Sequence, residues 1–331
     1  MTNIILKTGA LCIAIALSAC NLTQRPLEEK NPETTQSPAS YTVNISEASV
    51  LRSMEYLTSD ELRGRETGTP GIEKAAIFIE KEFGNAGLKP FFSTYRDSFE
   101  VRNRTGYNIV GYLEGNDPSL KNEFVILGAH YDHIGLGKVV DGDSIANGAN
   151  DNAAGTVAVL ELAKHFAKER SNKRSMLFIL FSAEEMGLVG AKHIANRLKT
   201  DNINLYTMVN FEMIGVPMKD KDYLAYLTGY ELSNMAEKFN EYAGDQVLGF
   251  LPQAQEYQLF QRSDNYSFYQ EFNIPAQTIS TFDFTNFDFY HHVSDEIEHM
   301  NIPHMVSVIE RVIPGIRGIT RSVERDIKMK N

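Results

Sequence analysis

The stretch MLFILFSAEE, residues 176–185, predicts both the fold class and the place of a functional site. Residues 176–182 are apolar or small without alternation, which is typical of a central strand covered on both faces. Glu184 and Glu185 follow almost at once. Adjacent carboxylates beside a buried strand raise each other's pKa and lose solvation, so such a pair usually persists only where a cation or a proton-transfer role compensates it. A glutamate pair in the first turn of a solvated helix is the plainer alternative.

Similar apolar runs recur along the chain, separated by segments with helical periodicity. Further strands are expected at 107–113, 124–129, 208–211, 223–228 and 275–280, and helices at 41–57, 72–83, 153–166, 188–198, 232–242 and 303–317. Strands that alternate with helices predict a three-layer α/β/α sandwich around a mostly parallel, mixed sheet. No internal repeat or second domain is indicated, so we expect residues 41–331 to form a single domain.

The first 40 residues differ in composition from the rest. Lys7 and the apolar run 10–17 lead into the tetrapeptide LSAC at 17–20, which resembles the lipobox of bacterial lipoproteins. We therefore expect a signal peptide at 1–19, a lipid anchor on Cys20 and a flexible tether at 20–40. An ordinary signal-peptidase site beside an incidental cysteine is the alternative. The expected location is the bacterial cell envelope, facing the periplasm or the outside.

The overall composition is that of an ordinary globular protein. The chain has 331 residues, of which 43% are hydrophobic and 23% charged, enough for one substantial core. Its net charge is −11 and it has no cluster of Lys and Arg, which argues against nucleic acid and anionic lipid as partners. The sequence leaves the oligomeric state open.

Polar residues stand at the ends of several predicted strands, where open α/β sheets place their ligands. His130 leaves the strand at 124–129, and Asp132 is expected to accept the other imidazole N–H, as at metal sites; a satisfied core histidine is the alternative. Asp151 lies among small residues before a helix, where it fits an N-cap equally well. Glu212 ends the run at 208–211, although a strand-end acid carries little weight alone.

A late group, YHHVSDE at 290–296, follows an aromatic-rich stretch. Two histidines and several carboxylates at one sheet edge match the ligand set for two zinc ions that share a bridging carboxylate. No GxSxG turn, phosphate-binding glycine loop or CxxC pair competes with this interpretation. The clusters together carry far more weight than any one of them.

The ordered motifs AHYDH, GANDNAAG, FSAEEMGLVGA, NFEMIG, RSDN and YHHVSDE resemble those of the di-zinc exopeptidases. This family includes secreted bacterial leucine aminopeptidases and, more distantly, glutamate carboxypeptidase, and the resemblance runs from about residue 60 to the C-terminal helix. It implies a cis peptide bond at 151–152. The ligands it implies are His130 and Glu212 for one zinc, Glu185 and His291 for the other, and Asp151 as the bridge between them.

The resemblance also implies catalytic roles. Glu184 matches the general base, which takes a proton from a water whose pKa two zinc ions lower and then protonates the departing amine. Asp132 would orient His130. Tyr290 falls where some relatives place a tyrosine that polarises the substrate carbonyl, and Arg262 lies in a segment that lines the substrate cleft. The expected reaction releases the N-terminal residue of a peptide or aminoacyl substrate.

This chain departs from the family pattern at two positions. Glu212 stands where relatives often have Asp, and Asn265 stands where RSDH is more usual. His291 is taken as the ligand because it lies four residues before Asp295, with His292 as its neighbour. The other histidines near helices are expected on the surface or in packing contacts: His165, His193, His299 and His304.

Two rival functions share this fold. Glutaminyl cyclases use one zinc ion and surround their substrate with tryptophan, whereas this chain has no Trp and a complete set of five ligands. A binding protein that had lost catalysis would lack ligands, and none is missing here. We therefore expect an aminopeptidase.

Overall fold

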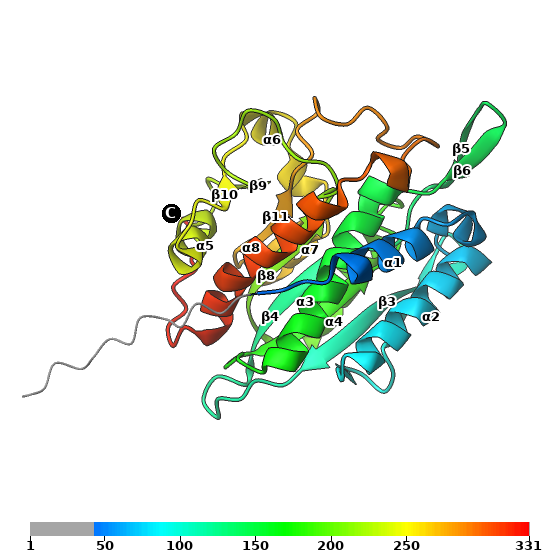
Figure 1. The fold of residues 1–331 in the computed structure, drawn as a ribbon. Helices are drawn as coiled ribbons and strands as arrows, with labels where there is room; N and C mark the ends of the chain where they lie inside the picture. The colour runs from blue at the N-terminus through cyan, green and yellow to red at the C-terminus, as the bar shows by residue number, and fades with distance from the viewer. Residues whose placement is uncertain (1–42, 331) are drawn as a thin grey trace, which may run out of the picture. The chain divides into compact units, whose positions relative to one another are not determined.

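The structure, a computed structural model, describes residues 43–330 (Figure 1). From Val43 onward the chain forms one compact unit. The expected signal peptide, Cys20 anchor and tether lie outside the described residues. Within residues 43–330, no helix combines the length and the apolar character needed to cross a membrane.

Nine strands within residues 43–330 form one mixed sheet in the order β1-β3-β7-β4-β8-β11-β9-β10, with β2 paired to β3. Neighbouring strands from β7 to β11 in that order are parallel, while β3 and β9 flank them in the antiparallel sense. The strands are β1 (Lys89–Pro90), β2 (Arg96–Val101), β3 (Arg104–Leu113), β4 (Glu123–His130), β7 (Ser175–Phe181), β8 (Asn204–Glu212), β9 (Ala225–Leu227), β10 (Leu248–Gly249) and β11 (Ala276–Ser280). The expected mixed, largely parallel sheet is confirmed.

Helices cover both faces of this sheet (Figure 1). In β7, Phe178 and Leu180 pack in the core on one face, and Ile179 and Phe181 pack in the core on the other. This two-sided burial explains why the run lacks polar alternation. One face carries α1 (Glu47–Leu57), α2 (Pro70–Asn85), α3 (Gly155–Glu169), α5 (Met235–Ala243) and α8 (Ile302–Arg321), and the other carries α4 (Val189–Thr200) and α7 (Asn265–Phe272).

The helix boundaries follow local capping. The first helix begins at Glu47 rather than near residue 41, because the side chain of Ser46 accepts a hydrogen bond from the Ser49 N–H. The helix at 153–166 begins at Gly155, after a π-helical turn η2 (Ala149–Ala154) that carries Asp151. Asp151 is therefore not the N-cap of α3, and the alternative role considered for it, helix capping, is excluded.

A two-stranded hairpin, β5 (Gly135–Val140) and β6 (Asp143–Ala146), projects from the sandwich (Figure 1). It leaves Leu136 54% exposed and Val139 61% exposed. The hairpin was not expected from the sequence.

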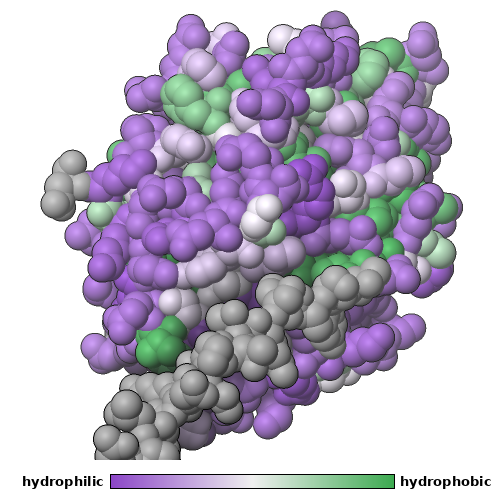
Figure 2. Space-filling model, turned by 60° about the vertical axis from the view of Figure 1, so that its left-hand side comes forward, coloured by the Kyte–Doolittle hydropathy of each residue, from purple (hydrophilic) through white to green (hydrophobic). Residues whose placement is uncertain are grey.

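The face drawn in Figure 2 is mostly hydrophilic, with hydrophobic residues in scattered patches, in keeping with the acidic composition.

We predict that His304, in the first turn of α8, makes the fold sensitive to acid. Burial lowers the pKa of this imidazole from its ordinary 6.5 to about 4, and its Nε2 has no hydrogen-bond partner among the described residues. Between these two values the unfolded chain binds a proton that the folded chain does not, so this contribution to stability is lost as the pH falls through that window. His304→Leu should reduce the fall in melting temperature between pH 6.5 and 4, whereas the exposed His299→Leu should not. Equal acid sensitivity in both variants would contradict the prediction.

Candidate metal centre

Polar side chains from distant parts of the chain meet at one edge of the sheet. His130 is the last residue of β4, Glu212 is the last residue of β8, and Glu184 follows the end of β7 by three positions. Asp151 lies in η2, and His291 lies in the segment after β11. These segments converge because β4, β7, β8 and β11 are parallel, so their carboxyl ends share one edge.

Asp151 lies at the centre of the group and is 2% exposed. Its Oδ1 lies 3.2 Å from His130 Nε2, and its Oδ2 lies 3.2 Å from His291 Nε2. Burial raises the pKa of Asp151, but the contacts with His130 and His291 outweigh it and hold this pKa well below its usual range. The two carboxylate oxygens of Asp151 thus face two different imidazoles.

The backbone around Asp151 is held from the C-terminal part of the chain. The Asp295 carboxylate accepts hydrogen bonds from the N–H groups of Asn150, at 2.8 Å, and Asp151, at 3.0 Å. The peptide bond between Asp151 and Asn152 is cis, as the family resemblance implies. The sequence indicated Asp295 only as one of the acids of YHHVSDE, and in the structure its carboxylate holds this turn.

His130 directs its Nε2 toward Asp151 and its Nδ1 toward Asp132. Its Nδ1 lies 3.1 Å from the backbone carbonyl oxygen of Asp132 but 3.7 Å from the carboxylate Oδ1 of the same residue. The hydrogen bond therefore goes to the carbonyl, and the carboxylate that was expected to accept it lies just beyond hydrogen-bond distance. His130 Nε2 is buried and has no hydrogen-bond partner within the described chain.

The Asp132 carboxylate has a different role from the one expected. It accepts a hydrogen bond from the backbone N–H of Glu184, at 3.2 Å, and one from Thr67 Oγ1, at 3.3 Å. Asp132 thereby ties the loop after β4 to the loop that carries Glu184.

Glu184 and Glu185 lie in a loop before α4, so they are not the first turn of a solvated helix. Glu185 has a side chain only 10% exposed, and its Oε2 lies 3.1 Å from His291 Nε2. Burial raises the pKa of Glu184 well above its usual value; His130 opposes this, and the charges of Glu212 and Asp264 add to it. Glu184 is thus a half-buried carboxyl beside the other charged groups of the centre.

Glu212 and the RSDN segment form one hydrogen-bonded group. Ser263 Oγ donates to Glu212 Oε2, and burial raises the pKa of Glu212 to about 7. Asn265 instead bonds outside the site: its Nδ2 donates to the carbonyl of Ala276, at 3.0 Å, and its Oδ1 accepts from Thr278 Oγ1, at 2.8 Å. Asn265 therefore holds α7 against β11, and Ser263 is the residue of this segment that contacts a predicted ligand.

A pocket opens beside Glu212. Its walls are largely apolar or aromatic, with Arg262, which is exposed, on its lining. Tyr290 is 51% exposed, and its ring stacks on His291 with centroids 4.0 Å apart. The lining residues are Glu212, Met213, Tyr226, Thr228, Leu259, Arg262, Ser263, Thr278, Ser280, Phe282, Phe284 and Tyr290.

The remaining histidines differ in their distance from this centre. His133 lies inside the centre. The sequence indicated no role for it, although it is the last residue of the AHYDH motif. Its Nδ1 lies 2.9 Å from Glu185 Oε1. His292 Nδ1 instead accepts a hydrogen bond from the backbone N–H of Ser294, while His165 and His193 pair with Glu169 and Asp97 outside the site.

A buried arginine that sequence reasoning missed holds the loops behind the centre. Arg65 is 1% exposed, and its guanidinium donates to the carbonyls of Tyr131 at 2.9 Å, Asn147 at 2.5 Å and Gly148 at 3.0 Å, and also to that of Leu57. Burial lowers the pKa of Arg65 to about 10, against the raising effect of nearby carboxylates, so it stays charged at neutral pH. Its only sequence signal was a basic residue in a loop.

The model of peptidase family M28 matches residues 108–314 of this chain. The chain is 26% identical over 289 residues to a probable leucine aminopeptidase of Arthroderma otae, covering 83% of this chain and 73% of that protein. It is 28% identical over 169 residues to leupeptin-inactivating enzyme 1 of Streptomyces exfoliatus, covering 50% of this chain. This match spans only 35% of the Streptomyces protein.

Solved structures of two kinds share the fold. The LapA aminopeptidase of Legionella pneumophila matches with a TM-score of 0.65 at 20% identity, covering 85% of this chain and 73% of that one. A glutaminyl cyclase of Fimbriiglobus ruber matches with a TM-score of 0.64 at 19% identity, covering 85% of this chain and 97% of that one. At such identities the likeness shows the fold and does not separate the two chemistries.

We predict that Arg65→Met lowers the free energy of unfolding by about 3–5 kcal/mol, because buried carbonyls lose a charged donor. Urea denaturation measures this loss, and Arg52→Met, an exposed change in α1, is the matched control. Stability equal to that of the control would show that Arg65 does not hold these loops.

Proposed function

The chain belongs to peptidase family M28, and on this premise we propose that it is a zinc-dependent aminopeptidase that binds two zinc ions. The observation that carries the proposal is the position of Asp151. Its two oxygens each lie 3.2 Å from the Nε2 atom of a different histidine, His130 and His291. A carboxylate whose two oxygens face two different histidines is suited to bridge two ions. A centre with one zinc ion would need only one of these two contacts.

The donor set fits zinc. Imidazole nitrogen and carboxylate oxygen are common zinc ligands, and the buried Nε2 of His130 has no hydrogen-bond partner in residues 43–330. The hydrogen bond at His130 Nδ1 fixes the tautomer that leaves Nε2 free to bind a metal. We assign His130 and Glu212 to one ion, Glu185 and His291 to the other, and Asp151 to both.

In the proposed mechanism, zinc in this site supplies a Lewis acid that polarises a carbonyl and makes water nucleophilic at neutral pH. Glu184 accepts the proton of the attacking water and returns it to the departing amine. Tyr290, half-exposed beside His291, would donate to the substrate carbonyl.

The substrate follows from the pocket beside Glu212. Phe282, Leu259 and Met213 on its lining favour an apolar side chain, and the carboxylates of the centre favour a free α-amino group. We therefore propose peptides with an apolar N-terminal residue, such as leucine, as substrates. Arg262 would contact the part of the substrate that lies in the pocket.

Glu184→Gln tests the mechanism. We expect this variant to retain the zinc content of the unchanged protein and to lose hydrolysis of leucine p-nitroanilide by about 10²–10⁴-fold, because the general base is lost. Zinc is measured by elemental analysis after dialysis, and Glu237→Gln, an exposed change in α5, is the control. Full activity in Glu184→Gln would disprove the assigned role.

The same preparation separates the aminopeptidase from its rival. Two zinc ions per chain and chelator-sensitive release of leucine support the proposal. One zinc ion, no hydrolysis and release of ammonia from a peptide that begins with Gln would instead identify a glutaminyl cyclase.

We also propose that Cys20 carries a lipid that holds the domain at the bacterial cell envelope, on the strength of the LSAC tetrapeptide. Cys20→Ser should move the full chain from the membrane fraction to the soluble fraction of cells. An unchanged distribution would contradict the anchor.

A further inference from the structure

His133 is as deeply buried in the centre as the predicted ligands His130 and Asp151. It is 1% exposed, and its backbone N–H donates to the carbonyl of Arg65 at 3.3 Å. Gly148 makes room for its ring: a Cβ at this glycine would lie 2.5 Å from His133 Cγ. The ring of His133 therefore packs directly against the backbone of Gly148, where a larger residue would clash with it.

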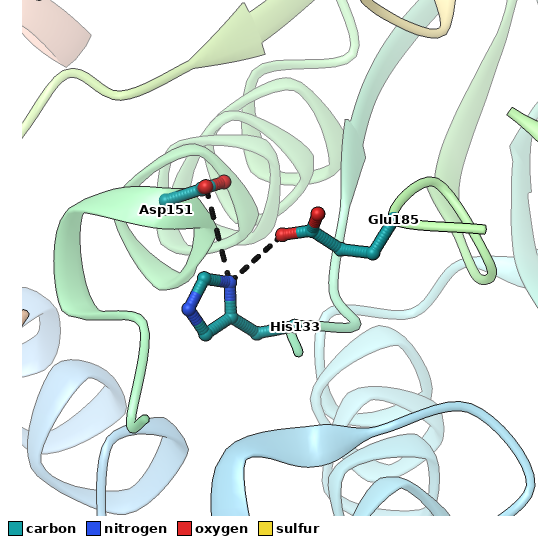
Figure 3. Close-up of side chains that lie close together, drawn as sticks. All are labelled: His133, Asp151 and Glu185. Carbon is teal, nitrogen blue, oxygen red and sulfur yellow. Dashed lines mark hydrogen bonds and ion pairs between the residues drawn. The ribbon is translucent and has the colours of Figure 1, made fainter. Parts of the chain in front are cut away.

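The imidazole of His133 faces the two carboxylates of the second ion's expected position (Figure 3). Its Nδ1 lies 2.9 Å from Glu185 Oε1 and 3.9 Å from Asp151 Oδ2. The first distance is a hydrogen bond and the second is not. His133 thus contacts Glu185 directly, and approaches Asp151 without bonding to it.

The two imidazoles use opposite oxygens of Glu185. His291 Nε2 lies 3.1 Å from Glu185 Oε2 and 3.2 Å from Asp151 Oδ2, whereas His133 contacts Oε1. Zinc bonds of about 2.0–2.1 Å in tetrahedral geometry place ligand atoms about 3.3 Å apart. His291 Nε2 lies at about this spacing from both Asp151 Oδ2 and Glu185 Oε2, whereas His133 contacts the other oxygen of Glu185.

We propose that His133 is a positioning residue: its Nδ1–H donates to Glu185 Oε1, fixes the rotation of that carboxylate and leaves Oε2 for the metal. This inference rests on the proposed zinc function. Three protein ligands leave a coordination position open for water or substrate, as catalysis requires, whereas a fourth from His133 would fill it. Hydrogen bonds to ligating groups typically change metal affinity by about 10–100-fold.

Two substitutions of the same residue test the proposal. In His133→Asn, the amide Nδ2 can donate from about the position of Nδ1, but this side chain is not among the usual zinc ligands. His133→Leu removes the donor and keeps an apolar group in the space. The matched control is His165→Asn, which removes a His–Glu contact of 3.2 Å in α3, away from the site.

The readouts are zinc affinity, measured by competition with a chromophoric chelator, and the visible spectrum of the Co²⁺-substituted protein. We expect His133→Leu to bind one of its two ions about 10–100-fold more weakly, and His133→Asn to match the unchanged protein within a few fold with the same Co²⁺ spectrum. Circular dichroism of the metal-free forms checks folding. If His133→Leu does not fold, His133→Gln replaces it, because its amide lies one bond further out and cannot donate from the Nδ1 position.

Each other outcome overturns the inference in a distinct way. Equal loss of affinity in His133→Asn and His133→Leu, with a changed Co²⁺ spectrum, would make His133 a direct ligand. Unchanged affinity in His133→Leu would remove any role in metal binding. Absence of two bound zinc ions in the unchanged protein and in His165→Asn would instead refute the proposed function itself.

Discussion

The burial of several carboxylates at one edge of the sheet is the constraint on which the rest of this structure depends. Asp151, Glu185 and Glu212 repel one another there. Contacts with histidines hold the pKa values of Asp151 and Glu185 below their usual range despite burial, whereas the pKa of Glu212 stays raised. Arg65 adds positive charge to this cluster from behind the loops. Zinc ions on the open side would add more positive charge next to Glu212, whose pKa is raised, so stability of the edge and metal binding would be linked.

Hydrogen bonds to the backbone keep this edge in place. Asp132, Asp295 and Arg65 each bind main-chain groups of loops that carry predicted ligands, and none of the three is itself a predicted ligand. The site thus consists of loops that are hydrogen-bonded to one another. These loops start at the same edge of the sheet because the strands before them are parallel. The relation of His133 to Glu185 extends the same principle to the ligand side chains.

The sequence predicted those parts of the fold whose signal is local. The apolar run of β7 indicated a strand because both of its faces are buried, and the polar residues after β4, β7 and β8 indicated one edge because parallel strands share it. The β5–β6 hairpin escaped because its pairing leaves apolar residues exposed, and no core imposes a pattern on it. The sequence also predicted that Asp132 lies near His130, but the acceptor is its backbone carbonyl and not its carboxylate. His133 and Arg65 were not predicted, because contacts between distant loops produce no periodic pattern in the sequence.

The hydrogen bonds from Asn150 and Asp151 to Asp295 join the middle of the chain to its last tenth or so. A ribosome that has made the first 280 residues has already produced the four parallel strands, yet the turn around Asp151 still lacks its acceptor and His291 has not been synthesised. Loading of the proposed zinc ions would therefore follow completion of the polypeptide. The same arrangement means that a premature stop codon between residues 280 and 290 would remove both His291 and Asp295, together with α8 and its share of the core.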